Sequence, residues 1–471
     1  MTVSPCRNSF FVEYKDLYQF LTVVQENCLN NNCRQIVSIS LEIDLVDPLV
    51  VLDELAQVNE INFYFENKGK GEAIAAIDSV ATLSIDGTDR FSKAENFIKS
   101  SLKNIVKFSN DNLPFSGPHF FCYFSFFPQN SQADYPFSAA TIFLPRWQIS
   151  IKNQRCILVM NSVVTASENI NRILQTLCNK IDTINSLKYY SPNLEVFPAN
   201  FSKKSVSNAN HFKSSVTSAL EKIRNNHLTK IVLADALDVQ SSNDFNLFKS
   251  LNNLRQIHPN CYIFSTSNGK GQNFIGASPE RLICIHDQKL ITDALAGSAP
   301  RGKTPTEDAA NANLLINNEK EKHEHSLVID FITQRLSQIG LLPQVLPPRL
   351  RQLSNIQHLW TPISALVPAN VHPLKIVAQL HPTPAVAGAA RDIACAEIRR
   401  YENFERGLYA APLGWVDSEG NCEFVVGIRS ALIDGDRARL YAGAGIVAGS
   451  DPEKEFAEVQ LKLQALLKAL V

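Results

Sequence analysis

Two pairs of glutamates lie in segments that the sequence predicts to be helices, and the two members of each pair are one helical turn apart. Glu321 and Glu324 lie on one such run, and Glu455 and Glu458 lie on the helix predicted at the end of the sequence. Side chains three residues apart share one face of a helix, and Mg²⁺ prefers carboxylate oxygens as ligands. Two pairs that face each other would hold a divalent cation from two directions. Such a metal suits an enzyme that handles a small, multiply anionic substrate.

The same spacing also fits an ordinary charged helix surface, and spacing alone favours that interpretation. Lys320 and Lys322 flank the first pair, and Glu458 and Lys462 have the i,i+4 spacing of a surface ion pair. His323 and His325 point to different sides of a helix and lack the H-E-x-x-H spacing of zinc sites. The acidic pairs are therefore a candidate metal site only if the fold brings them together.

The last helix has clear start signals and a defined buried face. Ser450 or Asp451 can cap it, and Pro452 suits its first position. Glu455, Glu458 and Lys462 form a row roughly 80–90° from the centre of the apolar stripe, at the edge of the core where a cleft could lie. The stripe consists of Phe456, Val459, Leu463, Leu466 and Leu470.

A lysine opens an otherwise apolar predicted strand. Lys230 precedes Ile-Val-Leu-Ala, and a lysine in that place usually extends its ammonium to solvent. A general base would have to be neutral, yet at the ordinary pKa only roughly 0.04% of lysine is neutral at pH 7. Burial away from a metal would lower this pKa, so burial is the condition under which Lys230 could act as a base.

Three glycines precede the last helix. Gly443, Gly445 and Gly449 are predicted to form a glycine-rich loop between a strand and that helix. Their spacing, G-x-G-x-x-x-G, differs from the G-x-G-x-x-G of dinucleotide-binding sites, and no βαβ unit follows. Free backbone N–H groups in such a loop could still receive a carboxylate.

Composition and charge exclude several classes of partner. The 471 residues carry a formal net charge of −1, which provides no field for nucleic acid or an anionic membrane. Ten cysteines without C-x-x-C spacing indicate reduced thiols. Residues 1–25 lack the apolar core of a secretory signal, and the most apolar stretch, residues 119–128, is about half a membrane span. We expect a cytoplasmic protein with no nucleic-acid and no membrane partner.

The pattern along the chain predicts an α+β fold, with layered antiparallel β-sheets and helices packed outside. Residues 1–200 contain four glycines and residues 201–471 contain fifteen, so binding loops are expected in the second part. The boundary is soft, because one core can include both parts. Strands are predicted at residues 62–65, 120–127, 140–143, 155–164, 230–239, 262–267, 273–276, 281–285, 413–416, 422–431 and 437–442. Helices are predicted at residues 92–108, 167–187, 205–225, 318–338 and 452–470.

Short motifs occur in order along the second part. They are Lys230-Ile-Val-Leu-Ala, Ser278-Pro-Glu-Arg281, Leu295-Ala-Gly-Ser298, Pro300-Arg-Gly302, Glu319-Lys-Glu-Lys-His-Glu-His325, Gln357-His358-Leu359, His381-Pro-Thr-Pro384, Arg406-Gly-Leu-Tyr409, Gly427-Ile-Arg-Ser430, Gly443-Ala-Gly-Ile446 and Glu455-x-x-Glu458-x-x-x-Lys462. Together they resemble the chorismate-utilising enzymes: isochorismate synthases, salicylate synthases, and the large subunits of anthranilate and aminodeoxychorismate synthases. Residues 1–200 resemble the variable N-terminal half of the same fold only loosely, so residues 201–471 are expected to be the chorismate-binding catalytic part.

The resemblance implies a magnesium site and a site for chorismate, a small dianionic molecule. It implies that Glu324 and Glu458 ligate Mg²⁺ and that Glu455 and Glu321 complete the shell, directly or through water. The metal would hold the ring carboxylate of chorismate. The substrate-binding residues implied by the resemblance are Gly297, Ser298, His358, Tyr409, Arg429, Gly443, Gly445 and Lys462.

Two further residues carry the chemistry that the resemblance implies. Ammonia-using members resemble one another in having glutamine at position 230, whereas water-using members have lysine. Lys230 is thus expected to activate water for attack at ring C2, and Glu280 to protonate the departing C4 hydroxyl. Aminodeoxychorismate synthases of the type that uses a nucleophilic lysine carry that lysine where Ala296 stands, so this chain lacks it. The expected activity is isochorismate synthase, an isomerase serving quinone (menaquinone or phylloquinone) or siderophore biosynthesis, with no glutaminase partner.

Other functions stay open on the sequence alone. A salicylate synthase would go on to eliminate pyruvate; Ala385, where such relatives tend to have threonine, favours stopping at isochorismate. A chorismate-binding protein without activity is suggested only by Asp235, which stands where relatives commonly have arginine and alters the expected charge near Lys230. An anthranilate-type enzyme and a nucleotide-linked oxidoreductase are the remaining alternatives.

Overall fold

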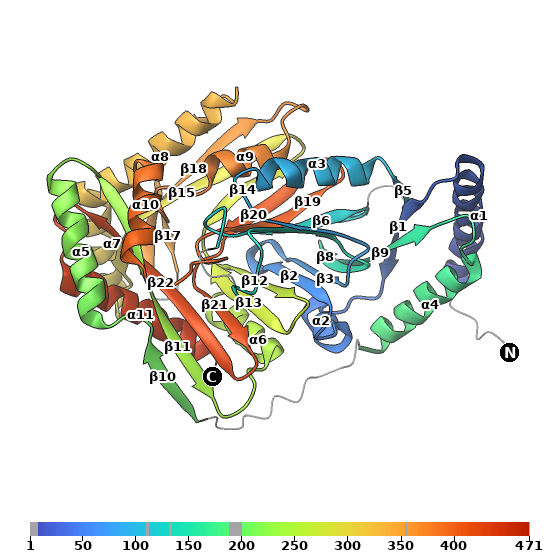
Figure 1. The fold of residues 1–471 in the computed structure, drawn as a ribbon, viewed down its shortest axis with the longest axis horizontal. Coiled ribbons are helices and arrows are strands. Elements are labelled where there is room, and N and C mark those ends of the chain that lie inside the picture. Colours follow the sequence, from blue (N-terminus) through green and yellow to red (C-terminus); the bar gives the residue numbers. More distant parts are fainter. Residues whose placement is uncertain (1–7, 110–112, 131–133, 188–199, 354–355, 471) are drawn as a thin grey trace.

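Two large β-sheets form the centre of the molecule, and the helices lie outside them (Figure 1). The computed structural model describes residues 8–109, 113–130, 134–187, 200–353 and 356–470. All described strand pairs are antiparallel except β1 with β5. Across the first sheet the strands are β10 (Phe201–Ser205), β11 (Lys230–Ser241), β22 (Arg437–Val447), β21 (Ser430–Asp434), β13 (Gln272–Ser278), β12 (Tyr262–Asn268), β2 (Ile61–Asn67), β3 (Glu72–Ile77), β8 (Trp147–Lys152), β9 (Arg155–Val164), β1 (Gln35–Ile43) and β5 (Ile105–Phe108).

The second sheet packs over the first and continues the layered arrangement. Across it the strands are β16 (Gln344–Val345), β18 (Ile356–Leu366), β15 (Lys289–Pro300), β14 (Arg281–His286), β20 (Cys422–Val426), β19 (Pro412–Asp417), β6 (His119–Phe124), β7 (Ala140–Leu144) and β4 (Ala81–Ile85), with β17 (Arg349–Gln352) also on β18. The helices are α1 (Asn8–Asn31), α2 (Pro48–Leu55), α3 (Arg90–Leu102), α4 (Ile170–Ser186), α5 (Ala209–Arg224), α6 (Leu247–Ile257), α7 (Pro305–Asn317), α8 (Glu319–Gln338), α9 (Pro373–Leu380), α10 (Arg391–Tyr401) and α11 (Pro452–Leu470), with the short η1 (Lys68–Lys70). The predicted α+β class is confirmed.

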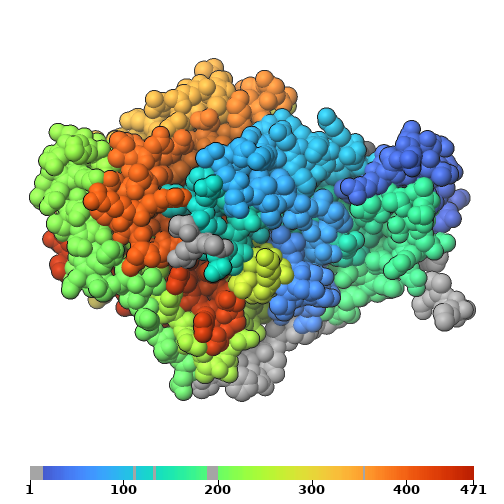
Figure 2. All heavy atoms as spheres, viewed as in Figure 1, coloured from blue at the N-terminus to red at the C-terminus, as the bar shows by residue number. Residues whose placement is uncertain are grey.

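The two parts of the chain share both sheets and one hydrophobic core. In the first sheet β12 pairs with β2, and in the second β19 pairs with β6. The main core cluster contains buried residues from both sides of residue 200. Figure 2 shows the same mixing at the surface, where blue atoms of the first part lie against orange atoms of the second. Residues 1–200 therefore do not form a separate layer.

Side-chain caps close the first turns of α8 and α11, and α11 begins where its capping residues predict. The Asn318 side chain accepts the backbone N–H groups of Lys320 and Glu321. The Asp451 carboxylate accepts those of Glu453 and Lys454, each at 3.0 Å. Both caps satisfy donors that the first turn of a helix leaves without partners. The bounds of α11 match the prediction.

Three of the predicted elements are wrong. The glycine-rich loop is instead the end of β22, which runs to Val447 and includes Gly443 and Gly445. The strand predicted at 422–431 is two strands in different sheets, because the chain turns at Arg429, whose φ is +51°. The helix predicted at 92–108 ends at Leu102 and is followed by β5. In each case pairing with distant strands overrides the local pattern.

Two further observations bear on the environment of the protein. In the described part of the chain, no helix is long and apolar enough to cross a bilayer. The nine cysteines that the structure describes are free thiols, as their irregular spacing predicts.

Candidate active site

A cavity of about 180 Å³ is lined by strands of both sheets and by α8 and α11. Helix α8 packs on β15, and α11 packs on β22 and β11, so residues far apart in sequence converge on one space. All but one of the thirteen predicted catalytic, substrate-binding and metal-binding residues line it. These are Glu280, Gly297, Ser298, Glu324, His358, Tyr409, Arg429, Gly443, Gly445, Glu455, Glu458 and Lys462. The exception is Lys230.

Four carboxylates from α8 and α11 enter the cavity. Glu321 and Glu324 come from α8, and Glu455 and Glu458 from α11. Burial raises the pKa of the Glu321 carboxyl, and the charge of Glu324 raises it further. Burial likewise raises the pKa of Glu455, to which Glu458 adds. The charge of Glu458 on α11 also raises the pKa of Glu321 on α8. The charge of Glu324 on α8 likewise raises the pKa of Glu455 on α11. The two acidic pairs therefore feel each other's charge, and an ordinary charged helix surface does not describe them.

Two lysines balance part of this negative charge. The Lys230 ammonium lies 2.7 Å from Glu324 Oε1. The Lys462 ammonium lies 2.8 Å from Glu458 Oε1 and donates to the carbonyl of Gly443 at 2.9 Å. Each acidic pair thus has one carboxylate bound to a lysine.

The donor set in the cavity fits a hard divalent cation. Five glutamates line it, against three basic side chains, Lys320, Arg429 and Lys462. A dianionic ligand would add to this negative charge, and a divalent cation would offset it. Among the described residues, no three His, Cys, Asp or Glu side chains already stand in a metal-binding arrangement. Glu324 and Glu458 are held by lysines instead, so a cation would have to compete for them.

Lys230 lies behind the cavity wall. It is 1% exposed, so it does not extend to solvent as a lysine at a strand start usually does, and the burial that a base requires is present. A Cβ added at Gly445 would lie 3.3 Å from Lys230 Cε and 3.2 Å from Glu324 Oε1. Burial alone would raise the pKa of the Glu324 carboxyl, but the ammonium of Lys230 holds it below its ordinary value. Lys230 therefore contacts the cavity only through the ionised carboxylate of Glu324. The absence of a side chain at Gly445 leaves room for both groups.

Glu280 sits on the turn that joins β13 to β14. Ser278 fixes this turn, because its hydroxyl accepts the backbone N–H of Glu280 and donates to the Glu280 carbonyl, both at 3.2 Å. The Glu280 side chain is buried, 4% exposed. Burial raises the pKa of its carboxyl to about 8. The positive charge of Lys230 opposes this rise, and the negative charge of Asp293 adds to it. Glu280 is thus mostly protonated at pH 7 and can give a proton to a bound ligand.

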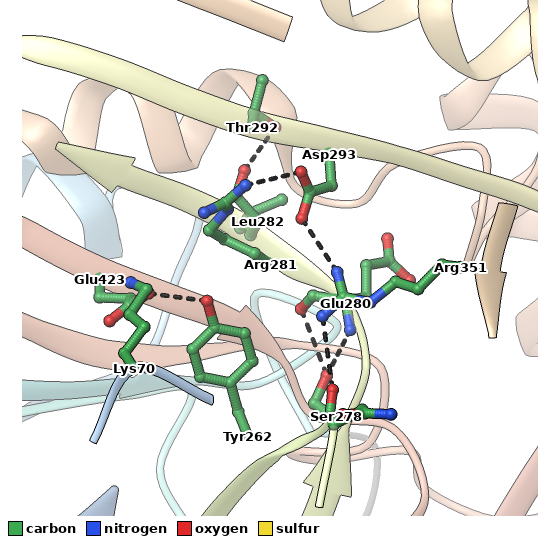
Figure 3. Close-up of polar contacts among 11 residues, drawn as sticks. Lys70, Tyr262, Ser278, Glu280, Arg281, Leu282, Thr292, Asp293, Arg351 and Glu423 are labelled. Carbon is green, nitrogen blue, oxygen red and sulfur yellow. Dashed lines mark hydrogen bonds and ion pairs between the residues drawn. The ribbon is translucent and has the colours of Figure 1, made fainter. Parts of the chain in front are cut away.

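A buried ionic network lies beside Glu280 (Figure 3). Asp293 Oδ1 accepts from Arg281 at 2.8 Å, and Asp293 Oδ2 accepts from Arg351 at 3.4 Å. Asp293 is 3% exposed, and the two arginines approach it from different strands. Nothing in the local spacing of Asp293 or Arg351 marks either residue as part of a site, so neither could be predicted from the sequence.

The remaining predicted residues supply neutral and cationic groups. His358 Nδ1 lies 3.1 Å from the hydroxyl of Ser298. Burial, followed by the charge of Arg429, lowers the pKa of His358 to about 3, so its imidazole is neutral. A Cβ on Gly443 would lie 2.9 Å from the hydroxyl of Tyr409. An anion in the cavity would therefore lie near the guanidinium of Arg429 and near glycine backbone that carries no side chain. It would also lie near the neutral hydrogen-bonding groups of His358 and Tyr409.

The structure also fixes the positions of Lys320, His325 and Asp235. Lys320, interpreted as part of a charged surface, lines the cavity one turn before Glu324. The i,i+4 spacing of Lys320 and Glu324 places both on one helix face, and this spacing could have predicted that Lys320 lies at the site. His325 points into the core, where its Nε2 lies 2.8 Å from Thr361 Oγ1. Asp235 is fully buried but lies an odd number of residues from Lys230, so its side chain is on the other face of β11.

Comparison with known proteins agrees with this geometry. A family model described as chorismate binding enzyme matches residues 23–471. The chain belongs to the chorismate-binding enzyme family. The resemblance inferred from the motifs is thereby confirmed, and it extends over the first part of the chain as well.

Several members of this family are similar to the chain. The salicylate biosynthesis isochorismate synthase of Pseudomonas aeruginosa is 39% identical over 262 residues, which are 55% of this chain and only 54% of that relative. Isochorismate synthase MenF of Bacillus subtilis is 30% identical over 454 residues, which are 92% of this chain and 93% of that relative. The solved structure of MenF, the menaquinone-specific isochorismate synthase of Escherichia coli, has a TM-score of 0.78 at 26% identity and covers 96% of this chain and 100% of that chain.

The wider family shares the fold. Anthranilate synthase component I of Streptococcus pneumoniae has a TM-score of 0.69 at 21% identity, over 84% of this chain and 92% of that chain. Members with different chemistry are therefore built on one scaffold, and the activity has to be argued from the side chains in the cavity.

Proposed function

We propose that this protein is an isochorismate synthase, an isomerase that converts chorismate to isochorismate. The observation that carries the proposal is a buried lysine, Lys230, paired with Glu324 at the cavity wall, together with a carboxylic acid in the cavity, Glu280, that is mostly protonated at neutral pH. One can take a proton from water and the other can give a proton to a leaving hydroxyl. The near full-length similarity to isochorismate synthase MenF supports the same activity.

In the proposed reaction, the neutral amine of Lys230 removes a proton from water as the water oxygen attacks ring C2. The ring double bonds shift, and the C4 oxygen leaves with the proton of Glu280 as a second water. One water enters and one departs, so the net change is a hydroxyl moved from C4 to C2. Proton return from Lys230 to Glu280, through solvent, restores the starting state.

The cationic groups of the cavity would hold the two carboxylates of chorismate. Arg429 and Lys462 line the cavity, and Lys462 is fixed there by the carbonyl of Gly443. Backbone at Gly443 and Gly445 can approach the substrate closely, because neither residue carries a Cβ. The hydroxyl of Tyr409 and the neutral imidazole of His358 would complete the contacts around the ring.

We infer that Mg²⁺ is the cofactor, held by Glu324, Glu455 and Glu458 with Glu321 beside them. When bound, it supplies positive charge that anchors and neutralises the ring carboxylate of chorismate. A cation at Glu324 would compete with the ammonium of Lys230, whose pair with this carboxylate is present in the structure.

Product analysis tests the proposal against its rivals. The protein is incubated with chorismate and Mg²⁺, and the products are separated by chromatography. We expect isochorismate, no accumulation of salicylate, and no anthranilate when ammonium salts are added. Abundant salicylate would favour the salicylate synthase alternative, and absence of any turnover would favour a binding protein without activity. Isochorismate would serve quinone or siderophore biosynthesis, for which we propose a cytoplasmic enzyme.

Removal of divalent cations is expected to abolish turnover, and added Mg²⁺ to restore it. A direct measurement separates binding from activity: calorimetric titration of Mg²⁺ into the protein should show saturable binding. Replacing Glu458 by glutamine should weaken this binding at least tenfold, since one anionic ligand is lost. The exposed Glu419 is a control position, where glutamine should change nothing. Full activity in chelator would contradict the assigned cofactor.

Gly445→Ala tests the space around the catalytic pair. The new Cβ would lie 3.2 Å from Glu324 Oε1 and 3.3 Å from Lys230 Cε, so both side chains must shift by a few tenths of an ångström. We expect about a tenfold loss of kcat with a folded protein, because small displacements of reacting groups are costly. Gly69→Ala is the matched control, as its Cβ would meet one atom, at 3.4 Å. Equal activity of both variants would show that the packing at Gly445 is not needed.

A further inference from the structure

One buried aspartate binds both of the arginines that flank the turn of Glu280. Arg281 follows Glu280 in the chain and pairs with Asp293 Oδ1 at 2.8 Å. Arg351 comes from β17 and lies beside the Glu280 side chain (Figure 3), but it pairs with Asp293 Oδ2 at 3.4 Å. Each carboxylate oxygen of Asp293 thus has a guanidinium partner.

Lys230, a third cation near Glu280, is also bound to another carboxylate. Its ammonium pairs with Glu324 at 2.7 Å. In the described part of the chain, no ion pair includes the buried Glu280. Desolvation favours the neutral form of a carboxyl that has no counter-ion. The arrangement of ion pairs therefore suits a proton donor at Glu280.

Arg351 is the cation that would most readily pair with Glu280. Its guanidinium also donates to the carbonyl of Asn260 at 3.5 Å and lies 5.7 Å from the centre of the Trp360 ring. These contacts hold it near the Glu280 turn independently of Asp293. Burial raises the pKa of the Glu280 carboxyl, the negative charge of Asp293 adds to the rise, and the positive charge of Arg351 opposes it. At Glu280, the charge of Asp293 therefore offsets that of Arg351.

We propose that Asp293 is a positioning residue: by binding Arg281 and Arg351, it keeps their guanidinium groups from pairing with Glu280. The inference deepens the proposed function and rests on it for the role of Glu280 as the acid. Asp293 does not line the cavity, so it acts through Glu280 and not on the substrate. Without its carboxylate, two buried or half-buried guanidinium groups would lose their shared counter-ion.

The groups that face Glu280 come from four parts of the chain. They are Lys230 of β11, Asp293 of β15, Arg351 of β17 and Thr383 of the segment between α9 and α10. Further titratable groups of the same cavity are the carboxylates of α8 and α11, Lys320, His358, Arg429 and Lys462. Variants at Asp293 and Arg351 leave all the other groups in place, so they isolate the effect of these two charges on Glu280.

Two variants of opposite charge effect test the inference through the pH profile of kcat. Asp293→Asn keeps the side-chain shape and removes the charge, so the alkaline limb should move about one unit toward lower pH. At about pH 8 this shift lowers kcat about fivefold. Arg351→Gln should move the limb about one unit toward higher pH, and Arg351→Lys, which keeps the charge, should leave it in the wild-type position. A loss of packing alone would not shift the limb in opposite directions.

A direct measurement separates this inference from the proposed function. Infrared difference spectra across pH follow the protonated carboxyl band of Glu280, when each protein is compared with its counterpart that also carries Glu280→Gln. The midpoint of this band should shift as the kcat limb does, and it needs no turnover. Glu42→Gln breaks an exposed ion pair with Arg155, 2.8 Å long, and is the matched control that should leave the midpoint unchanged.

The outcomes of the two measurements are distinguishable. An unchanged midpoint in Asp293→Asn, or midpoints that move the same way in Asp293→Asn and Arg351→Gln, would overturn the inference even if kcat still depends on Glu280. Midpoints that shift in opposite directions without a matching shift of kcat would support the inference and contradict Glu280 as the acid. Arg351 is only partly buried, so Arg351→Gln provides the test if Asp293→Asn does not fold.

Discussion

Replacing Lys230 by alanine is expected to lower kcat by about 10²–10⁴-fold, the usual contribution of a general base. The water that attacks ring C2 would have no amine to take its proton, and within the described structure no other lysine is buried against Glu324. KM should change little, because Lys230 lies behind the cavity wall and does not line it. Steady-state kinetics with chorismate, at saturating Mg²⁺, measure both effects.

The alanine variant also leaves the Glu324 carboxylate without its ion-pair partner, so folding must be checked separately. Removing one partner of a buried pair typically costs about 3–5 kcal/mol. Lys230→Arg keeps a positive charge beside Glu324 but cannot lose a proton, and it should be equally inactive. Lys204→Ala, at an exposed position on β10, is the control. Wild-type turnover in Lys230→Arg would mean that the base lies elsewhere.

Replacing Glu280 by glutamine is expected to lower kcat by about 10²–10⁴-fold and to remove the alkaline limb of the pH profile. Burial raises the pKa of this carboxyl to about 8, so its proton is present below that pH and lost above it. Wild-type kcat should therefore fall as pH rises through about 8. The residual activity of Glu280→Gln should lack this decline, since glutamine does not titrate. Initial rates between about pH 6 and about pH 10 test this.

A stability measurement supports the same assignment without using activity. The folded protein holds a proton on Glu280 between its ordinary pKa, 4.5, and about 8, whereas the unfolded chain does not. This group therefore makes the free energy of unfolding decrease as pH rises through that range. Glu280→Gln should lose this part of the decrease and keep the rest. An unchanged alkaline limb in Glu280→Gln would assign it to another group.

Local sequence was sufficient for several features of the fold and site. Asp451 and Pro452 define the start of α11, and its apolar stripe faces the core as predicted. These signals act within one or two helical turns, so they need no information about the rest of the chain. The ordered motifs likewise identified the family, and all but one of the thirteen site residues predicted from them line the active-site cavity.

Strand boundaries near the site needed tertiary information. Gly443 and Gly445 suggest a loop by composition, yet both lie in β22, because pairing with β11 satisfies their backbone groups. Because neither glycine carries a side chain, Tyr409 can lie close to Gly443, and the Lys230–Glu324 pair can lie close to Gly445. The two arginines that bind Asp293 likewise meet only through the second sheet, in which β18 pairs with both β15 and β17.

The order of residues alone determined which side chains carry chemistry: a lysine at a strand start, a glutamate on a turn and acidic pairs one helical turn apart. Only the tertiary structure decided that α8 and α11 direct their carboxylates into one space, that Lys230 is buried against Glu324, and that Glu280 holds its proton. Charge states of this kind depend on desolvation and on neighbours brought from elsewhere in the chain. Desolvation of these groups and the charges of their distant neighbours arise only once the two sheets have packed.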